Sequence, residues 1–142
     1  MTADSSDPAP VLDTDKIIAT LNEYGVDYIV VGGLGARMHG AGRITKDFGY
    51  VIKSADQNFD RVVNAMGELG AFMRVDKVSD YVARDVKFDM RWMIAGQDVT
   101  TWRTVAGDID IMRTIPNEAA ERLTYDALIL NTGERTQESI QV

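Results

Sequence analysis

Residues 31–51 read VGGLGARMHGAGRITKDFGYV, and this stretch decides the fold. It opens at the end of a short β-branched run, residues 28–31 (YIVV), whose composition is typical of a buried strand. The run ends at Gly32-Gly33, and residues 34–39 predict a short helix. Backbone N–H groups at a helix start bind phosphate, so this turn is a candidate phosphate site, although an isolated Gly-Gly more often marks only a tight turn.

The strands that follow supply candidate metal ligands. Residues 47–53 (DFGYVIK) have strand composition, and alternation along a strand sends Asp47 and Gly49 to the same face. Residues 107–112 (GDIDIM) form a second strand, in which Asp110 stands between isoleucines. An apolar strand seldom carries a half-buried carboxylate without a partner. We therefore expect Asp47 and Asp110 to lie on adjacent strands and to share one or two Mg²⁺ ions.

The flanking sequence predicts an α+β domain in which helices pack against a mixed sheet. Helices are predicted between Asp13 and Gly25, from about residue 56 to Gly70, and over residues 117–130. Further strands are predicted at residues 71–75, 86–94, 99–102 and 109–112, with a hairpin turn at residues 95–98.

Composition excludes several classes of site. The chain has 142 residues and no cysteine, which rules out disulfides, thiolate zinc sites and cysteine nucleophiles. The net charge of −7 argues against a general nucleic-acid coat but not against phosphate chemistry assisted by metal ions. No apolar run approaches a membrane span, and residues 1–12 read as a disordered, acidic lead unlike a signal peptide, so we expect a cytoplasmic protein without a membrane partner.

Taken together, Val31-Gly32-Gly33, the Arg43-x-Thr45-x-Asp47 run and the later Asp110 strand resemble the nucleotidyltransferase superfamily, which has a polymerase-beta-like core. The small AbiEii-like, toxin-type branch is the most similar. The resemblance covers roughly residues 13–130. It implies transfer of a nucleoside monophosphate from an NTP to a macromolecular hydroxyl, a tRNA 3′ end or a protein side chain, with Mg²⁺ or Mn²⁺. It also implies a toxin of a toxin–antitoxin or phage-defence pair, with a cognate antitoxin as partner.

The resemblance further assigns roles to individual positions. Asp47 would be the first metal ligand, and Asp110 would be the third carboxylate, which also helps to deprotonate the incoming hydroxyl. Arg43 suits a bidentate contact with phosphate, although a solvated surface position fits it equally well. The positions expected to bind the nucleotide are Gly32, Gly33, Arg43 and Thr45.

The sequence departs from the family at two points. Gly49 stands where the family has its second carboxylate, and glycine offers no ligand atom. Three explanations stay open: a natural pseudoenzyme, substitution by Asp108, which shares a strand face with Asp110, or an inactivated variant of a toxic protein. Relatives also continue past Val142, so residues 13–142 are expected to form a domain truncated at its C-terminus. The alternative function is a non-catalytic nucleotide-binding or interaction module on the same scaffold.

The sole histidine and the two tryptophans are expected to be structural. His39 lies after an apolar segment, and the superfamily does not use histidine as its base. Trp92 and Trp102 sit on strand-like runs, which favours core or partner-facing positions over platforms for base stacking.

Overall fold

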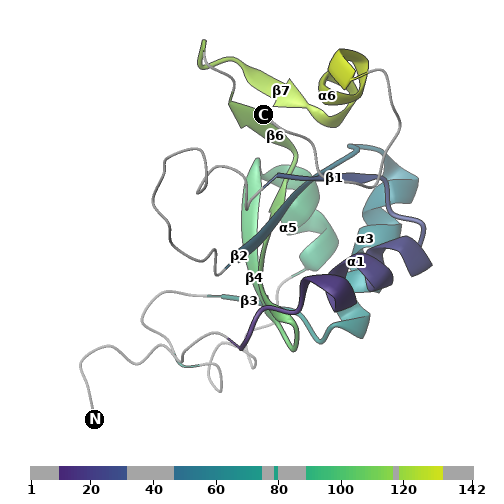
Figure 1. The fold of residues 1–142 in the computed structure, drawn as a ribbon, viewed down its shortest axis with the longest axis vertical. Coiled ribbons are helices and arrows are strands. Elements are labelled where there is room, and N and C mark those ends of the chain that lie inside the picture. The colour runs from purple at the N-terminus through teal and green to yellow at the C-terminus, as the bar shows by residue number, and fades with distance from the viewer. Residues whose placement is uncertain (1–9, 32–46, 75–78, 80–88, 117–118, 133–142) are drawn as a thin grey trace.

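The computed structural model describes residues 10–31, 47–74, 79, 89–116 and 119–132, without the side chains of Asp47, Asn131 and Thr132. Within these ranges the chain forms a five-stranded mixed sheet, a two-stranded sheet and four helices (Figure 1). The expected α+β architecture with helices packed on a mixed sheet is therefore confirmed.

The large sheet has the strand order β1-β2-β5-β4-β3, in which β2 and β5 run parallel and the other neighbours antiparallel. Its strands are β1 (Tyr28–Val30), β2 (Asp47–Ile52), β3 (Phe72–Met73), β4 (Val99–Thr104) and β5 (Gly107–Met112). The small antiparallel sheet consists of β6 (Thr114–Pro116) and β7 (Arg122–Thr124). The helices are α1 (Thr14–Glu23), α3 (Asp56–Glu68), α5 (Met90–Gly96) and α6 (Tyr125–Thr132).

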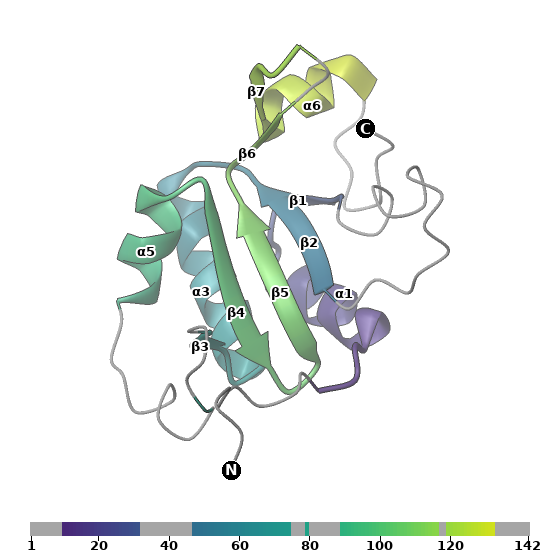
Figure 2. The ribbon, with the colours of Figure 1, turned by 90° about the vertical axis from the view of Figure 1, so that its left-hand side faces the viewer.

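One side of the large sheet packs against α1, α3 and α5, and this layer holds the main core (Figure 2). Tyr28 and Tyr50 are fully buried there, with their rings edge to face and their centroids 5.7 Å apart. Burial raises the pKa of Tyr28 to about 12. Burial also raises the pKa of Tyr50, with a smaller contribution from the charge of Tyr28. Both hydroxyls are therefore neutral in the folded protein at ordinary pH.

The other side of the sheet is only partly covered by apolar residues. Near the ends of β1 and β2, the side chains of Ile29 and Val51 pack with Ile115, Tyr125 and Leu128 in a second apolar cluster. This cluster joins β6, β7 and α6 to the end of the sheet that lies at the top of Figure 2. The rest of this side of the sheet carries the polar side chains described below.

Helix ends follow the signals in the sequence. The Asp13 carboxylate accepts a hydrogen bond from the Lys16 backbone N–H at 3.1 Å and caps α1 as predicted. Gly25 and Gly70, predicted as stops, have φ angles of +69° and +66°. These left-handed conformations suit glycine and end α1 and α3.

Asn58 fixes α3 to the connections that flank β1 and β2. Its side chain accepts a hydrogen bond from the Asp27 N–H at 2.8 Å and donates to the carbonyls of Asp27 at 3.0 Å and Lys53 at 2.9 Å. Asn58 is buried, so these three bonds also satisfy its own polar side-chain atoms.

The strand predicted at residues 86–94 and the hairpin turn at residues 95–98 are wrong where the structure describes them. Residues 90–96 form α5 instead, because the Asp89 carboxylate caps a helix by accepting from the Trp92 N–H at 3.0 Å. Arg91 then pairs with Asp60 of α3 at 2.8 Å. The hydrophobic pattern of a short apolar run fits a strand and a helix equally well. Here the Asp89 cap and the packing on α3 favour the helix.

The helix predicted over residues 117–130 begins later than expected. Residues 122–124 form β7, in which Leu123 pairs with Ile115 of β6. Ala120, with φ at +63°, interrupts the region where the helix was expected. The helix α6 starts at Tyr125, and the Thr124 hydroxyl accepts from the Ala127 N–H at 3.2 Å.

Candidate functional site

The polar half of the sheet centres on the parallel pair β2 and β5. In their register Gly49 lies beside Asp110, and Asp47 lies beside Asp108. The prediction that Asp47 and Asp110 occupy adjacent strands is therefore confirmed. We call this side of the sheet, defined by Gly49, Thr101, Arg103, Asp108 and Asp110, the carboxylate face.

Asp110 is half-buried and makes a short contact with β4. The Thr101 hydroxyl donates a hydrogen bond to Asp110 Oδ1 at 2.7 Å. Thr101 is the register partner of Asp110 on β4, so the two side chains project from the same side of the sheet. The bond orients one carboxylate oxygen of Asp110 along the sheet surface.

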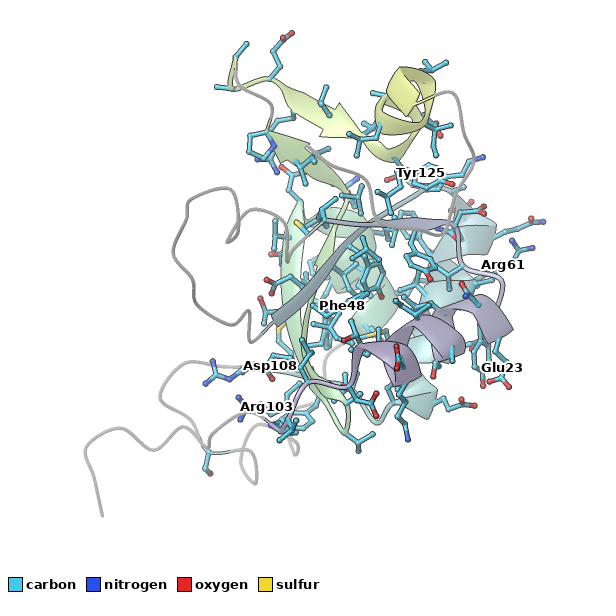
Figure 3. The ribbon with its side chains drawn as sticks, viewed as in Figure 1. Glu23, Phe48, Arg61, Arg103, Asp108 and Tyr125 are labelled. Carbon is cyan, nitrogen blue, oxygen red and sulfur yellow. The ribbon has the colours of Figure 1, made fainter. Side chains whose placement is uncertain are left out.

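Asp108 has a different environment, since its carboxylate forms a buried salt bridge. Arg103 Nε donates to Asp108 Oδ1 at 2.8 Å, and a terminal guanidinium nitrogen of Arg103 donates to Oδ2 at 3.0 Å. The residue exposures of Arg103 and Asp108 are 2% and 6%. Arg74, which follows β3, contributes a longer contact of 3.8 Å from its Nε to Oδ2. Figure 3 shows Arg103 and Asp108 together on the side of the sheet away from α1.

This salt bridge bears on the explanation that Asp108 replaces the missing carboxylate at position 49. Both oxygens of Asp108 already accept bidentate hydrogen bonds from Arg103, the strong geometry for this pair. A cation at Asp108 would have to displace the buried guanidinium of Arg103 from both carboxylate oxygens. The geometry therefore disfavours Asp108 as a substitute ligand.

Val31, the last described residue before Gly32, lies beside the same strand pair. The Val31 N–H donates to the Gly49 carbonyl at 2.9 Å, and Gly49 is the register partner of Asp110. Gly32 and Gly33 themselves lie outside the described residues, as do Arg43, Thr45, His39 and the predicted helix over residues 34–39. For Asp47 the structure describes the backbone position in β2 alone.

The donor set does not fit a complete two-metal site. Among the residues that the structure describes, no group of three histidine, cysteine or carboxylate side chains is placed to hold a metal ion. Gly49 has no ligand atom, and Asp108 is held by Arg103. Among the described side chains of this face, Asp110 keeps one carboxylate oxygen outside its hydrogen bond with Thr101.

Sequence reasoning missed the basic partners of the carboxylate face. The signal was present in residues 100–104 (TTWRT), where Thr101 and Arg103 alternate with the apolar Trp102. A charged residue that alternates with apolar residues in a buried strand predicts an oppositely charged partner on the neighbouring strand. Asp108, paired with Arg103 across β4 and β5, is that counter-charge.

The two tryptophans differ in environment. Trp102 is 2% exposed on the helix-covered side of the sheet, and its indole N–H donates to the Thr100 hydroxyl at 2.8 Å, as a core position requires. Trp92, on α5, is 70% exposed. Among the helices that the structure describes, none has both the length and the hydropathy of a membrane-spanning segment.

Comparison with known proteins gave no match: no family model, no curated protein and no solved structure is significantly similar to this chain.

Proposed function

We propose that this chain is a nucleotidyltransferase-like protein that binds an NTP at the carboxylate face. The observation that supports this best is the hydrogen bond from the Val31 N–H to the Gly49 carbonyl, beside Asp110. The residues that follow Val31 in the sequence are Gly32 and Gly33, the proposed phosphate-binding positions. Phosphate-binding backbone and acidic side chains on neighbouring strands are the combination that nucleotidyl transfer uses.

The chemistry that the resemblance implies is an in-line displacement. An acceptor hydroxyl oxygen would attack the α-phosphorus, the bond from that phosphorus to its bridging oxygen would break, and pyrophosphate would leave. Asp110 is the group positioned to accept the proton of the hydroxyl, since its second oxygen does not take part in the Thr101 bond. A tRNA 3′ end or a protein side chain as acceptor, and a cognate antitoxin, belong to the same proposal.

Gly49 lowers the expected rate of this reaction. Phosphoryl transfer depends almost entirely on positioning and charge stabilisation, and Gly49 removes one of three carboxylates from the centre. Mg²⁺ would neutralise charge on the triphosphate if it were bound, but the residues that the structure describes include no group of three metal-ligating side chains. We therefore propose that NMP transfer by this chain is weak.

A second candidate function has its own supporting observation. In the Arg103–Asp108 salt bridge, a guanidinium group of the protein neutralises a carboxylate of the carboxylate face. This is expected of a protein that has the nucleotidyltransferase fold and binds nucleotide without catalysing transfer. Such a module binds NTP with little dependence on Mg²⁺, and an added acid at position 49 creates no activity.

The test combines labelling with calorimetry. Wild type, Gly49→Asp and Gly49→Asp with Asp110→Asn are incubated with each labelled NTP, Mg²⁺ and either bulk tRNA or protein acceptors. Labelling that rises in Gly49→Asp and disappears with Asp110→Asn supports the transferase. NTP binding by wild type with or without Mg²⁺, and no labelling by any variant, supports the module. Absence of NTP binding and of labelling in every variant overturns both.

A further inference from the structure

The two aspartates of β5 face the same side of the sheet, but different groups hold their carboxylates. Both oxygens of Asp108 accept hydrogen bonds from Arg103. For Asp110 the structure describes one side-chain hydrogen bond, which Oδ1 accepts from the Thr101 hydroxyl at 2.7 Å. This distance is typical of a hydroxyl that donates to an ionised carboxylate. Asp110 therefore has one oxygen held by the protein and a second oxygen outside that bond.

The sheet register places a donor on one side of Asp110 only. Thr101 is the partner of Asp110 in the antiparallel pair β4 and β5, and Gly49 is its partner in the parallel pair β2 and β5. Because β5 lies between β4 and β2, Thr101 and Gly49 flank Asp110 on opposite sides. The neighbour on β4 supplies a hydroxyl group, whereas the neighbour on β2 has no side chain.

The bond to Thr101 restricts the side-chain torsions of Asp110. Thr101 is β-branched and sits within a strand, so its own χ1 has few choices and its hydroxyl is a well-placed donor. Oδ1 of Asp110 has to stay on the side of β4 to accept from it. The two oxygens of a carboxylate point in different directions, so Oδ2 is turned away from Thr101. Oδ2 is thus the oxygen left for a ligand.

We propose that Thr101 is a positioning residue that holds Asp110 in one rotamer, with Oδ1 bound to β4 and Oδ2 presented to a ligand. This rotamer is a property of the protein without nucleotide. Its consequence for transfer rests on the proposed function: an acceptor hydroxyl would meet the same oxygen of Asp110 in every molecule, without a search among conformations. A merely structural threonine would affect stability and leave the orientation of Asp110 unchanged.

The first measurement is nuclear magnetic resonance on wild type, Thr101→Val and Thr101→Ser without nucleotide. Valine keeps the branching of threonine but cannot donate, whereas serine keeps the hydroxyl. Three-bond couplings from the backbone nitrogen and carbonyl carbon to Cγ of Asp110 report whether one χ1 rotamer is populated. Thr14→Val is the matched control, because it makes the same exchange at an exposed position of α1, on the other side of the sheet (Figure 2).

Wild type, Thr101→Ser and Thr14→Val should show the couplings of a single Asp110 rotamer, and Thr101→Val should show averaged couplings. Far-UV circular dichroism shows which variants are folded. If Thr101→Val does not fold, Thr101→Ala, which also lacks the hydroxyl, takes its place. A single rotamer in a folded variant without the hydroxyl overturns the proposal, and so do averaged couplings in wild type.

The second measurement is NMP labelling, with the Thr101 variants made in the Gly49→Asp background. Loss of the hydroxyl should lower kcat by at least about tenfold, because a misplaced group loses much of its effect, and should leave KM for the NTP unchanged. Thr101→Ser should keep most of the activity. An unchanged kcat in Thr101→Val overturns the role in transfer. Absence of labelling in every variant counts against the proposed function alone, because the couplings test the orientation of Asp110 without nucleotide.

Discussion

Gly49 lies directly beside Asp110 in the parallel pairing of β2 and β5, so a position without a side chain adjoins the half-buried carboxylate that the Thr101 hydroxyl holds. The same two strands place Asp47 beside Asp108, whose oxygens are held by Arg103. The carboxylate face therefore combines acids, a glycine and a buried cation within two adjacent rows of the sheet.

Gly49→Ala is expected to stabilise the protein by about 0.5–1 kcal/mol, because glycine inside a strand loses more conformational freedom on folding than alanine. Urea denaturation measures this change. The methyl group adds no ligand, so labelling and Mn²⁺ binding should stay at the wild-type level. Gly67→Ala on α3 is a control for the measurement, since an added Cβ there meets no heavy atom within 4 Å and a similar gain is expected. Destabilisation by Gly49→Ala would contradict the prediction.

Removal of one partner of the Arg103–Asp108 pair is expected to cost about 3–5 kcal/mol, because the remaining buried charge loses two charge-assisted hydrogen bonds. Arg103→Met and Asp108→Leu together remove both charges, and the double variant should lose less than the sum of the two single losses. Urea titrations of all four proteins give the coupling energy of the double-mutant cycle. A coupling energy near zero would show that the salt bridge is not the interaction that stabilises this part of the sheet.

Asn58→Ala is expected to lower the free energy of unfolding by about 2–4 kcal/mol, since it removes the three hydrogen bonds by which a buried side chain of α3 holds the backbone of Asp27 and Lys53. The neighbouring Gln57 is exposed on the same helix, and Gln57→Ala should change stability by less than about 0.5 kcal/mol. Thermal and urea unfolding compare the two variants. Equal effects would refute a special role for Asn58.

The buried tyrosines predict a loss of stability at alkaline pH. Burial raises the pKa of Tyr28 to about 12, above the value near 10 of an unfolded tyrosine. The neutral hydroxyl therefore contributes stability that is fully present below pH 10 and is lost as the pH rises through 12, by at most about 1.4 kcal/mol per pH unit for each such group. The raised pKa of Tyr50 has the same sign.

Unfolding experiments at several pH values, with absorbance at 295 nm to follow tyrosinate, check this prediction. Tyr28→Phe should flatten the pH dependence between 10 and 12, although it also loses the hydrogen bond to Asn22 Oδ1 at 2.9 Å. If Tyr28 ionises near pH 10 while the protein stays folded, the prediction is wrong.

Much of the fold could be read from local signals. Asp13 predicted the start of α1, and Gly25 and Gly70 predicted helix ends, because capping and positive φ depend on a few neighbouring residues. The runs that became β2 and β5 were predicted as strands from their β-branched and aromatic residues. At α5 the hydrophobic pattern of the sequence predicted a strand, but the residues form a helix. The Asp89 side chain caps this helix, and Arg91 pairs it with Asp60 of α3.

The candidate site divides in the same way. The sequence by itself determined the candidate residues: Asp47 and Asp110 on predicted strands, a glycine at position 49, and Gly32-Gly33 after a β-branched run. Only the tertiary structure decided that Asp108 pairs with Arg103 and that Gly49 lies beside Asp110. The physical reason is that register and burial join strands far apart in the chain, so the partner of a carboxylate depends on the sheet and not on its neighbours in sequence.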